Sequence, residues 1–176
     1  MQPPPLICHK GSGPKGMASE GEVKMTEIKE KAEFGSKEWM DIADKVVVDV
    51  VADHRDKIAG ERFSTSYTFT NAPAHLCDDG QSSIGWSIFI DDGAITIDRA
   101  ERADVDFAMW VDYDYTLPNA RGLQTMEPES REEVEAKRQK AIADGLLVMK
   151  GTTEGASPAM IGMLVDMHNR FAEFTA

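Results

Sequence analysis

The chain has 176 residues, enough for one domain that buries a stable core without disulfides. Its 31 acidic and 19 basic residues give a net charge of −12, which disfavours nucleic acid and anionic membrane surfaces as partners. Two cysteines form no disulfide framework or zinc motif, and no apolar run resembles a membrane span or a secretory signal, so we expect a soluble cytoplasmic protein with no metal and no cofactor.

The first 34 residues are predicted to form a flexible tail. They combine a proline-rich start with mixed Lys and Glu residues and contain few large apolar side chains. Such a segment buries too little surface to offset the entropy lost on ordering, so we expect its first half to be disordered. A single α+β domain is predicted to span residues 35–176.

The first helix of this domain is predicted to begin after Ser36 and to end near Ala59. Ser36 is a suitable N-cap, and Gly60 is a suitable stop because glycine readily takes the left-handed conformation that ends helices. One face of this helix is apolar and needs a partner, and it carries Trp39, Ile42, Ala43, Val46, Val47 and Val50.

After this helix, the spacing of apolar residues changes from the 3.6-residue period of a helix to the two-residue period of strands. Residues 62–70 alternate apolar or bulky with small polar side chains, and residues 84–90 and 94–97 flank the turn chemistry of residues 91–93. A further alternation covers residues 104–113, with one apolar face made of Val105, Phe107, Met109, Val111 and Tyr113. We expect an antiparallel meander whose second face is exposed to water.

After a loop from Leu117 to Glu129, a capping box that starts at Ser130 predicts a helix that ends before Gly145. Residues 146–151 form a short strand, and Ser157 and Pro158 open a final helix. This order predicts an α+β fold with a five-stranded, mainly antiparallel sheet, covered on one face by helices and ending in a C-terminal helix.

The final helix carries a methionine-rich stripe at helical spacing, made of Met160, Met163, Leu164, Met167, Phe171 and Phe174. Methionine is flexible and polarizable, so this stripe suits either a core or a ligand of variable shape. We expect the stripe to enclose an apolar pocket.

Few residues have the spacing of a reactive centre. The four histidines, His9, His54, His75 and His168, share no metal-ligand spacing, and residues 75–79 are better explained as a surface loop than as a metal site. No nucleophile elbow, phosphate loop or dinucleotide motif is present. The only candidates for proton transfer are Asp112, Tyr113 and His75, and a strand that leaves the sheet explains the first two better than an acid and hydroxyl pair does.

Three segments resemble the sterol carrier protein family of small lipid-binding domains. Residues 86–93 (WSIFIDDG) are similar to its strand and hairpin turn, residues 102–107 (RADVDF) to its Ala-Asp strand start, and residues 143–151 (ADGLLVMKG) to the run before its last helix. The resemblance covers roughly residues 36–176 and implies an apolar tunnel for acyl chains or sterols, with no catalytic residues. The chain departs from the family in a charged insert between Tyr115 and Arg131 and ends without the peroxisomal tripeptide of some members.

Three functions follow as hypotheses. The first is binding or carriage of an apolar small molecule, with ligand-binding residues Phe107, Met109, Met160, Met163, Leu164, Met167 and Phe171. The second is an enzyme that moves a proton on an apolar substrate, as in isomerases and dehydratases with a cone-shaped fold. Those folds usually end on long strands, whereas this chain ends on a capped helix, so the sequence favours a binding protein. The third is an accessory protein whose Met-rich face docks a partner or a second copy in a homodimer.

Overall fold

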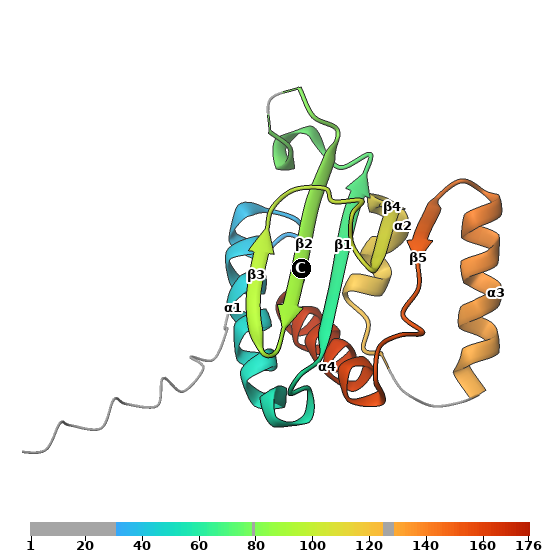
Figure 1. Cartoon of the computed structure of the whole chain (residues 1–176). Coiled ribbons are helices and arrows are strands. Elements are labelled where there is room, and N and C mark those ends of the chain that lie inside the picture. The colour runs from blue at the N-terminus through green and yellow to red at the C-terminus, as the bar shows by residue number, and fades with distance from the viewer. Residues whose placement is uncertain (1–30, 79, 125–128) are drawn as a thin grey trace, which may run out of the picture.

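The computed structural model describes residues 31–78, 80–124 and 129–176. Figure 1 shows the arrangement of the helices and strands, which are joined by two 3₁₀ turns, Arg55–Lys57 and Ala74–Leu76. In chain order they are α1 (Lys37–His54), β1 (Arg62–Thr70), β2 (Ser83–Asp91), β3 (Ala94–Asp98), β4 (Phe107–Asp112), α2 (Tyr113–Ala120), α3 (Glu129–Ala143), β5 (Leu147–Gly151) and α4 (Pro158–Phe174).

The strands form one five-stranded sheet in the order β3-β2-β1-β4-β5. The pairs β1–β2, β2–β3 and β4–β5 are antiparallel, so the predicted α+β fold with a mainly antiparallel sheet is confirmed. The pair β1–β4 is parallel, with Tyr67 opposite Met109. The expected simple meander is therefore interrupted, because the chain leaves the sheet edge at β3 and returns on the other side of β1.

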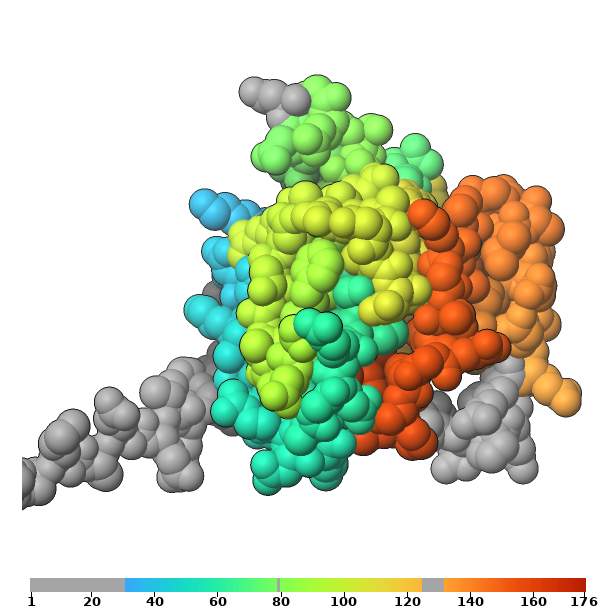
Figure 2. Space-filling model, viewed as in Figure 1, coloured from blue at the N-terminus to red at the C-terminus, as the bar shows by residue number. Residues whose placement is uncertain are grey.

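The connection from β3 to β4 crosses the outer face of the sheet. A Cβ on Gly85 of β2 would lie 2.2 Å from the backbone nitrogen of Glu101, so only a glycine allows this close approach. The hydroxyl of Ser87 donates to the carbonyl of Ala100 at 2.8 Å, and the backbone nitrogen of Arg102 donates to the hydroxyl of Ser66 at 3.1 Å. The expected wet face was therefore wrong for the middle of the sheet, where residues 99–106 cover it (Figures 1 and 2).

Helices α1 and α4 pack on the opposite face of the sheet, as expected for helices that cover one side (Figure 1). Both predicted caps are confirmed, since the hydroxyl of Ser36 accepts from the Trp39 nitrogen and that of Ser157 from the Met160 nitrogen, each at 3.1 Å. Helix α1 ends at His54, earlier than predicted, because the 3₁₀ turn Arg55–Lys57 precedes Gly60.

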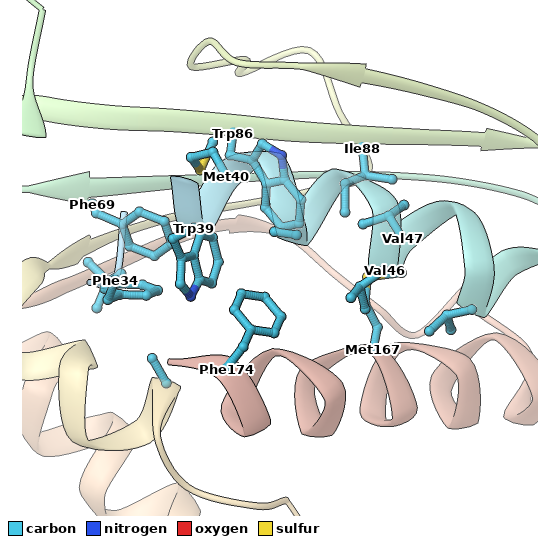
Figure 3. Packing of buried hydrophobic residues seen from close by; sticks show 14 of the residues in the cluster. Phe34, Trp39, Met40, Val46, Val47, Phe69, Trp86, Ile88, Met167 and Phe174 are labelled. Atoms are coloured by element: carbon cyan, nitrogen blue, oxygen red, sulfur yellow. The ribbon is translucent and has the colours of Figure 1, made fainter. Parts of the chain in front are cut away.

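Most of the methionine-rich stripe lies in the core between α1, α4 and the sheet. Met160 and Met163 are fully buried, and Met167 and Phe174 are 3% and 1% exposed. In Figure 3 Met167 points from α4 toward Val46 of α1. The structure does not favour the hypothesis of a Met-rich docking face, because this chain's own helix and sheet cover Met160, Met163, Met167 and Phe174.

The first described residues belong to the core. Ala32 forms a parallel bridge with Thr175, and Phe34 is 3% exposed and packs its ring 4.9 Å from that of Trp39. The ordered fold therefore includes residues just before the predicted domain start at residue 35. The predicted disorder falls on residues 1–30, which lie outside the described residues.

Two boundaries around the middle helices differ from the prediction. Strand β4 begins at Phe107 and ends at Asp112, and Tyr113 opens helix α2 where a strand end and then a loop were expected. Asp112 caps this helix by accepting from the Tyr115 nitrogen at 3.1 Å. Helix α3 already includes Ser130, so this residue lies inside the helix rather than ahead of it.

Helix α3 stands at the β5 edge of the sheet and is mostly exposed (Figure 1). Ala141 is its buried residue within 132–143, while Val134 and Ile142 are 50% and 40% exposed. None of the helices in the described part of the chain is both long and apolar enough to cross a membrane.

Candidate ligand cavity

A cavity of ≈ 230 Å³ lies between the sheet, α4 and α2. Its floor comes from three neighbouring strands, because Tyr67 of β1 is paired with Trp86 of β2 on one side and with Met109 of β4 on the other. The apolar lining residues are Phe34, Trp39, Tyr67, Phe69, Trp86, Met109, Ala120, Ile161, Leu164, Val165, Met167 and Phe171.

Aromatic rings build the wall near α1. The ring of Phe171 lies 5.4 Å from that of Trp86 and 5.7 Å from that of Trp39. Phe34 packs its ring edge-on against Phe69 at 4.8 Å. Such tilted and edge-on pairs are favourable ring arrangements, so the rings stabilise this side of the cavity.

The polar part of the lining lies where α2 meets α4, and consists of Thr116, Asn119, Gln124 and His168. His168 Nε2 donates to the carbonyl of Gly122 at 2.9 Å, which holds the end of α2 against α4. Burial lowers the pKa of His168, against smaller opposite effects of the Gly122 and Asn119 carbonyls. The imidazole is therefore neutral at pH 7, and this polar rim carries no cation from His168.

A wider groove of ≈ 1110 Å³ adjoins the cavity, between β4, β5, α2 and α3. Its apolar floor includes Phe107, Val111, Leu147 and Met149. Four residues line both spaces, namely Met109, Thr116, Asn119 and Gln124. Cavity and groove are therefore separated by a single layer of side chains.

The residues predicted to bind a ligand fall into three groups. Met109, Leu164, Met167 and Phe171 line the cavity, and Phe107 lines the groove. Met160 and Met163 line neither space and are fully buried in the core. A ligand role for the lining residues stays a prediction.

The three candidates for proton transfer lie in separate settings, and none of them lines the cavity or the groove. The Asn71 amide donates to Asp112 at 2.9 Å and lowers the pKa of this capping carboxyl. Tyr113 donates to the carbonyl of Phe34 at 2.7 Å, and burial raises the pKa of its phenol. His75 is exposed, with Nε2 3.0 Å from a carboxylate oxygen of Glu33.

A cation site is also not assembled in the described ranges, where no group of three or more His, Cys, Asp or Glu side chains converges. Cys77 Sγ instead donates to the carbonyl of Ala72 at 3.9 Å, and Asp79 lies outside those ranges.

Sequence reasoning missed several residues of the cavity wall. Tyr67, Phe69 and Trp86 were placed on apolar strand faces without being assigned to a pocket, and Phe34 was assigned to the tail. The signal available for β1 was its run of large aromatic residues, Phe63, Tyr67 and Phe69, which marks a face with much area to bury. Nothing in the sequence marked Gln124 or Thr116 as lining residues.

The sequence matches no protein-family model and no curated protein. Among solved structures the chain is similar to a conserved hypothetical protein of Thermus thermophilus, described as a candidate sterol carrier protein (12% identity, 84% of this chain, 93% of that chain, TM-score 0.47). It is also similar to sterol carrier protein domain 2 of Helicoverpa armigera (14%, 80% and 90%, 0.39) and to Sterol Carrier Protein 2 of Yarrowia lipolytica (14%, 71% and 78%, 0.32). These belong by name to the family that the sequence motifs resemble. Because every one of these TM-scores lies below 0.5, a function has to rest on this chain's own residues.

Proposed function

We propose that the protein binds, and thereby carries, an apolar small molecule in the cavity between the sheet, α2 and α4. The observation that carries this proposal is the wall itself. Aromatic and aliphatic side chains from β1, β2, β4, α1 and α4 surround a space inside the domain, and the polar lining groups gather where α2 meets α4. Concave, largely apolar sites with a few convergent polar groups are typical of small-molecule binding.

Filling this space favours binding for two reasons. Apolar area that a ligand loses to the cavity contributes about 25 cal/mol per Å². The lining atoms also gain dispersion contacts that an empty space denies them. The sequence motifs that resemble sterol carrier proteins support the same class of ligand.

The size of the cavity sets the kind of ligand. At ≈ 230 Å³ the cavity is smaller than the ~300–1,000 Å³ of sites for drug-sized ligands. A larger ligand needs the adjoining groove, which opens once Met109, an unbranched side chain that rotates easily, moves aside. We propose that an extended ligand lies across both spaces, with Phe107 and Met109 on one side and Leu164 and Phe171 on the other.

The test combines extraction and uptake. The purified full chain is extracted with organic solvent for mass spectrometry, and the extracted protein is titrated with a fluorescent acyl probe. Leu164→Trp fills the cavity and is expected to lower the probe affinity about tenfold or more, since one lost contact of ~1.4 kcal/mol is a factor of ten.

Val48→Trp is the matched control, because Val48 lies on the outer side of α1 and is 50% exposed. This variant adds the same bulk outside the cavity and is expected to bind the probe like the wild-type protein. Absence of both a co-purified lipid and probe uptake contradicts the proposal.

A homodimer stays a separate prediction, which size-exclusion chromatography with light scattering checks.

A further inference from the structure

Strand β1 carries two hydroxyl groups on the face that it turns toward the helices. Thr65 and Tyr67 are two positions apart, so their side chains project to the same side as Phe63 and Phe69. Thr65 is 1% exposed, and its Oγ1 has no hydrogen-bond partner among the described residues. This oxygen is an unpaired polar atom inside an apolar layer.

The phenol of Tyr67 is the neighbouring polar group. Tyr67 lines the cavity, between Trp86 and Met109 on the adjacent strands. Burial raises the pKa of Tyr67, and the hydroxyl of Thr65 lowers it by a smaller amount. The phenol is therefore neutral and keeps its proton as a donor at physiological pH.

An apolar core gains nothing from these two oxygens. Valine has the shape of threonine without the hydroxyl, and phenylalanine has the ring of tyrosine, so a valine and a phenylalanine at these two positions would fill the layer without a penalty. A buried hydroxyl without a partner lowers the stability of the folded protein. That cost is offset when the Thr65 hydroxyl donates to the phenol oxygen of Tyr67 and the phenol donates to a ligand oxygen in the cavity.

We propose that Tyr67 and Thr65 form a polar anchor for one uncharged oxygen, a hydroxyl or a carbonyl, at the head of an otherwise apolar ligand. Tyr67 donates to that oxygen from the cavity wall, and Thr65, which lines neither the cavity nor the groove, donates to the phenol oxygen from behind. This assignment rests on the proposed function and specifies the class of ligand: a neutral alcohol or carbonyl compound rather than a hydrocarbon or an ionised fatty acid.

The preference for an uncharged head follows from the charges around the anchor. No lysine or arginine is among the described residues that line the cavity, and His168 at its rim is neutral at pH 7. Lys137 and Arg138 line only the adjoining groove. A carboxylate at the anchor would lose its hydration without meeting a counter-charge, which costs several kcal/mol. A hydroxyl or carbonyl loses far less.

The test uses three probes of equal chain length with the delipidated full chain at pH 8: 1-octanol, octane and octanoate. Their affinities are measured by displacement of the neutral fluorophore N-phenyl-1-naphthylamine. The wild-type protein is expected to bind octanol at least tenfold more tightly than octanoate. Tyr67→Phe is expected to weaken octanol binding about 3- to 10-fold, the equivalent of one hydrogen bond, and to leave octane binding unchanged.

Two further variants separate the anchor from general damage to the fold. Thr65→Val is expected to weaken octanol binding while raising the urea midpoint of the ligand-free protein, since it removes an unpaired oxygen. Tyr113→Phe also removes a buried phenol oxygen, but that oxygen bonds to Phe34 and does not line the cavity. It is expected to lower stability and to keep the wild-type preference among the probes.

The outcomes are distinct. If the probes bind but octanoate equals octanol, or if Tyr67→Phe weakens octane and octanol alike, the anchor is contradicted while the proposed function stands. If none of the three probes nor the fluorophore binds the wild-type protein, the proposed function fails and the anchor fails with it.

Discussion

Trp39 Nε1 donates a hydrogen bond of 2.9 Å to Thr175 Oγ1, which joins the start of α1 to the residue after α4. Thr175 in turn donates to the carbonyl of Phe171 at 2.7 Å. Thr175→Val therefore leaves the buried indole N–H without a partner, while the Phe171 carbonyl keeps the backbone N–H of residue 175. We expect it to lower the free energy of unfolding by about 1–3 kcal/mol. Urea denaturation checks this as a lower midpoint with an unchanged slope.

Thr175→Ser is the control for that prediction, because it keeps the oxygen and loses only a methyl group. We expect it to retain most of the wild-type stability. An equal loss in both variants would show that packing, rather than the hydrogen bond, fastens the two helices.

Gly85→Ala is expected to destabilise the sheet by about 1–3 kcal/mol, since the new methyl group would overlap backbone atoms of Ala100 and Glu101. Gly162→Ala in α4 is the matched control, because a Cβ there has no atom within 4 Å and alanine is the better helix former. This second change is expected to raise stability by about 0.5–1 kcal/mol. Thermal unfolding of both variants measures the contrast, and a tolerated Gly85→Ala would contradict the close crossing.

Alanine substitutions at the neighbouring residues Met163 and Leu164 are expected to differ in their effects on stability and on probe affinity. Met163 is fully buried and lines no cavity, so Met163→Ala should cost about 2–5 kcal/mol of stability. Leu164 lines the cavity, so Leu164→Ala should cost less stability and change the affinity for the acyl probe more. Urea midpoints and probe titrations of both variants, under conditions where both are folded, test the assignment of the stripe to two roles.

The stability of the protein is expected to fall as the pH drops below about 7 because of His168. Burial lowers the pKa of His168 in the folded chain, whereas the unfolded chain titrates near ~6.5. The unfolded state therefore takes up the proton first as the pH falls, so protonation favours unfolding in the window below that value. His168→Gln removes this proton uptake, and its stability should depend less on pH across the same window. If urea titrations gave the wild-type protein and His168→Gln the same change of stability with pH, the prediction would be contradicted.

Elements whose local signals agree could be predicted from the sequence. Ser36 and Ser157 both cap helices as expected, and Asp92 and Gly93 form the hairpin turn with positive φ angles of 50° and 75°. In each case the cap or turn residue and the flanking apolar period specify the same element, so no tertiary information was needed.

The remaining features depend on contacts between distant segments. Apolar and polar residues continue to alternate up to Tyr113, so the sequence pattern predicts that β4 extends that far. It therefore does not indicate that Asp112 caps a helix. The parallel pairing of β4 with β1 has no local signature, although Gly85 inside an otherwise bulky strand was an available sign of a close backbone approach. Of the cavity wall, the sequence predicts the α4 residues and Met109 of β4 but not Tyr67 or Trp86, because these paired positions come together only through that same sheet order.

The crossing of residues 99–106 also has a consequence for the order of folding. Strands β1, β2 and β3 pair in sequence order, across residues 71–82 and 92–93, whereas the pairing of β4 with β1 closes the longer loop of residues 71–106. Pairings that close long loops cost more entropy and form more slowly than local ones. We expect the three-stranded unit to form early and the cavity, which needs β4 and α4, to be among the last parts to close. A ligand present during refolding should therefore meet a site that is still open.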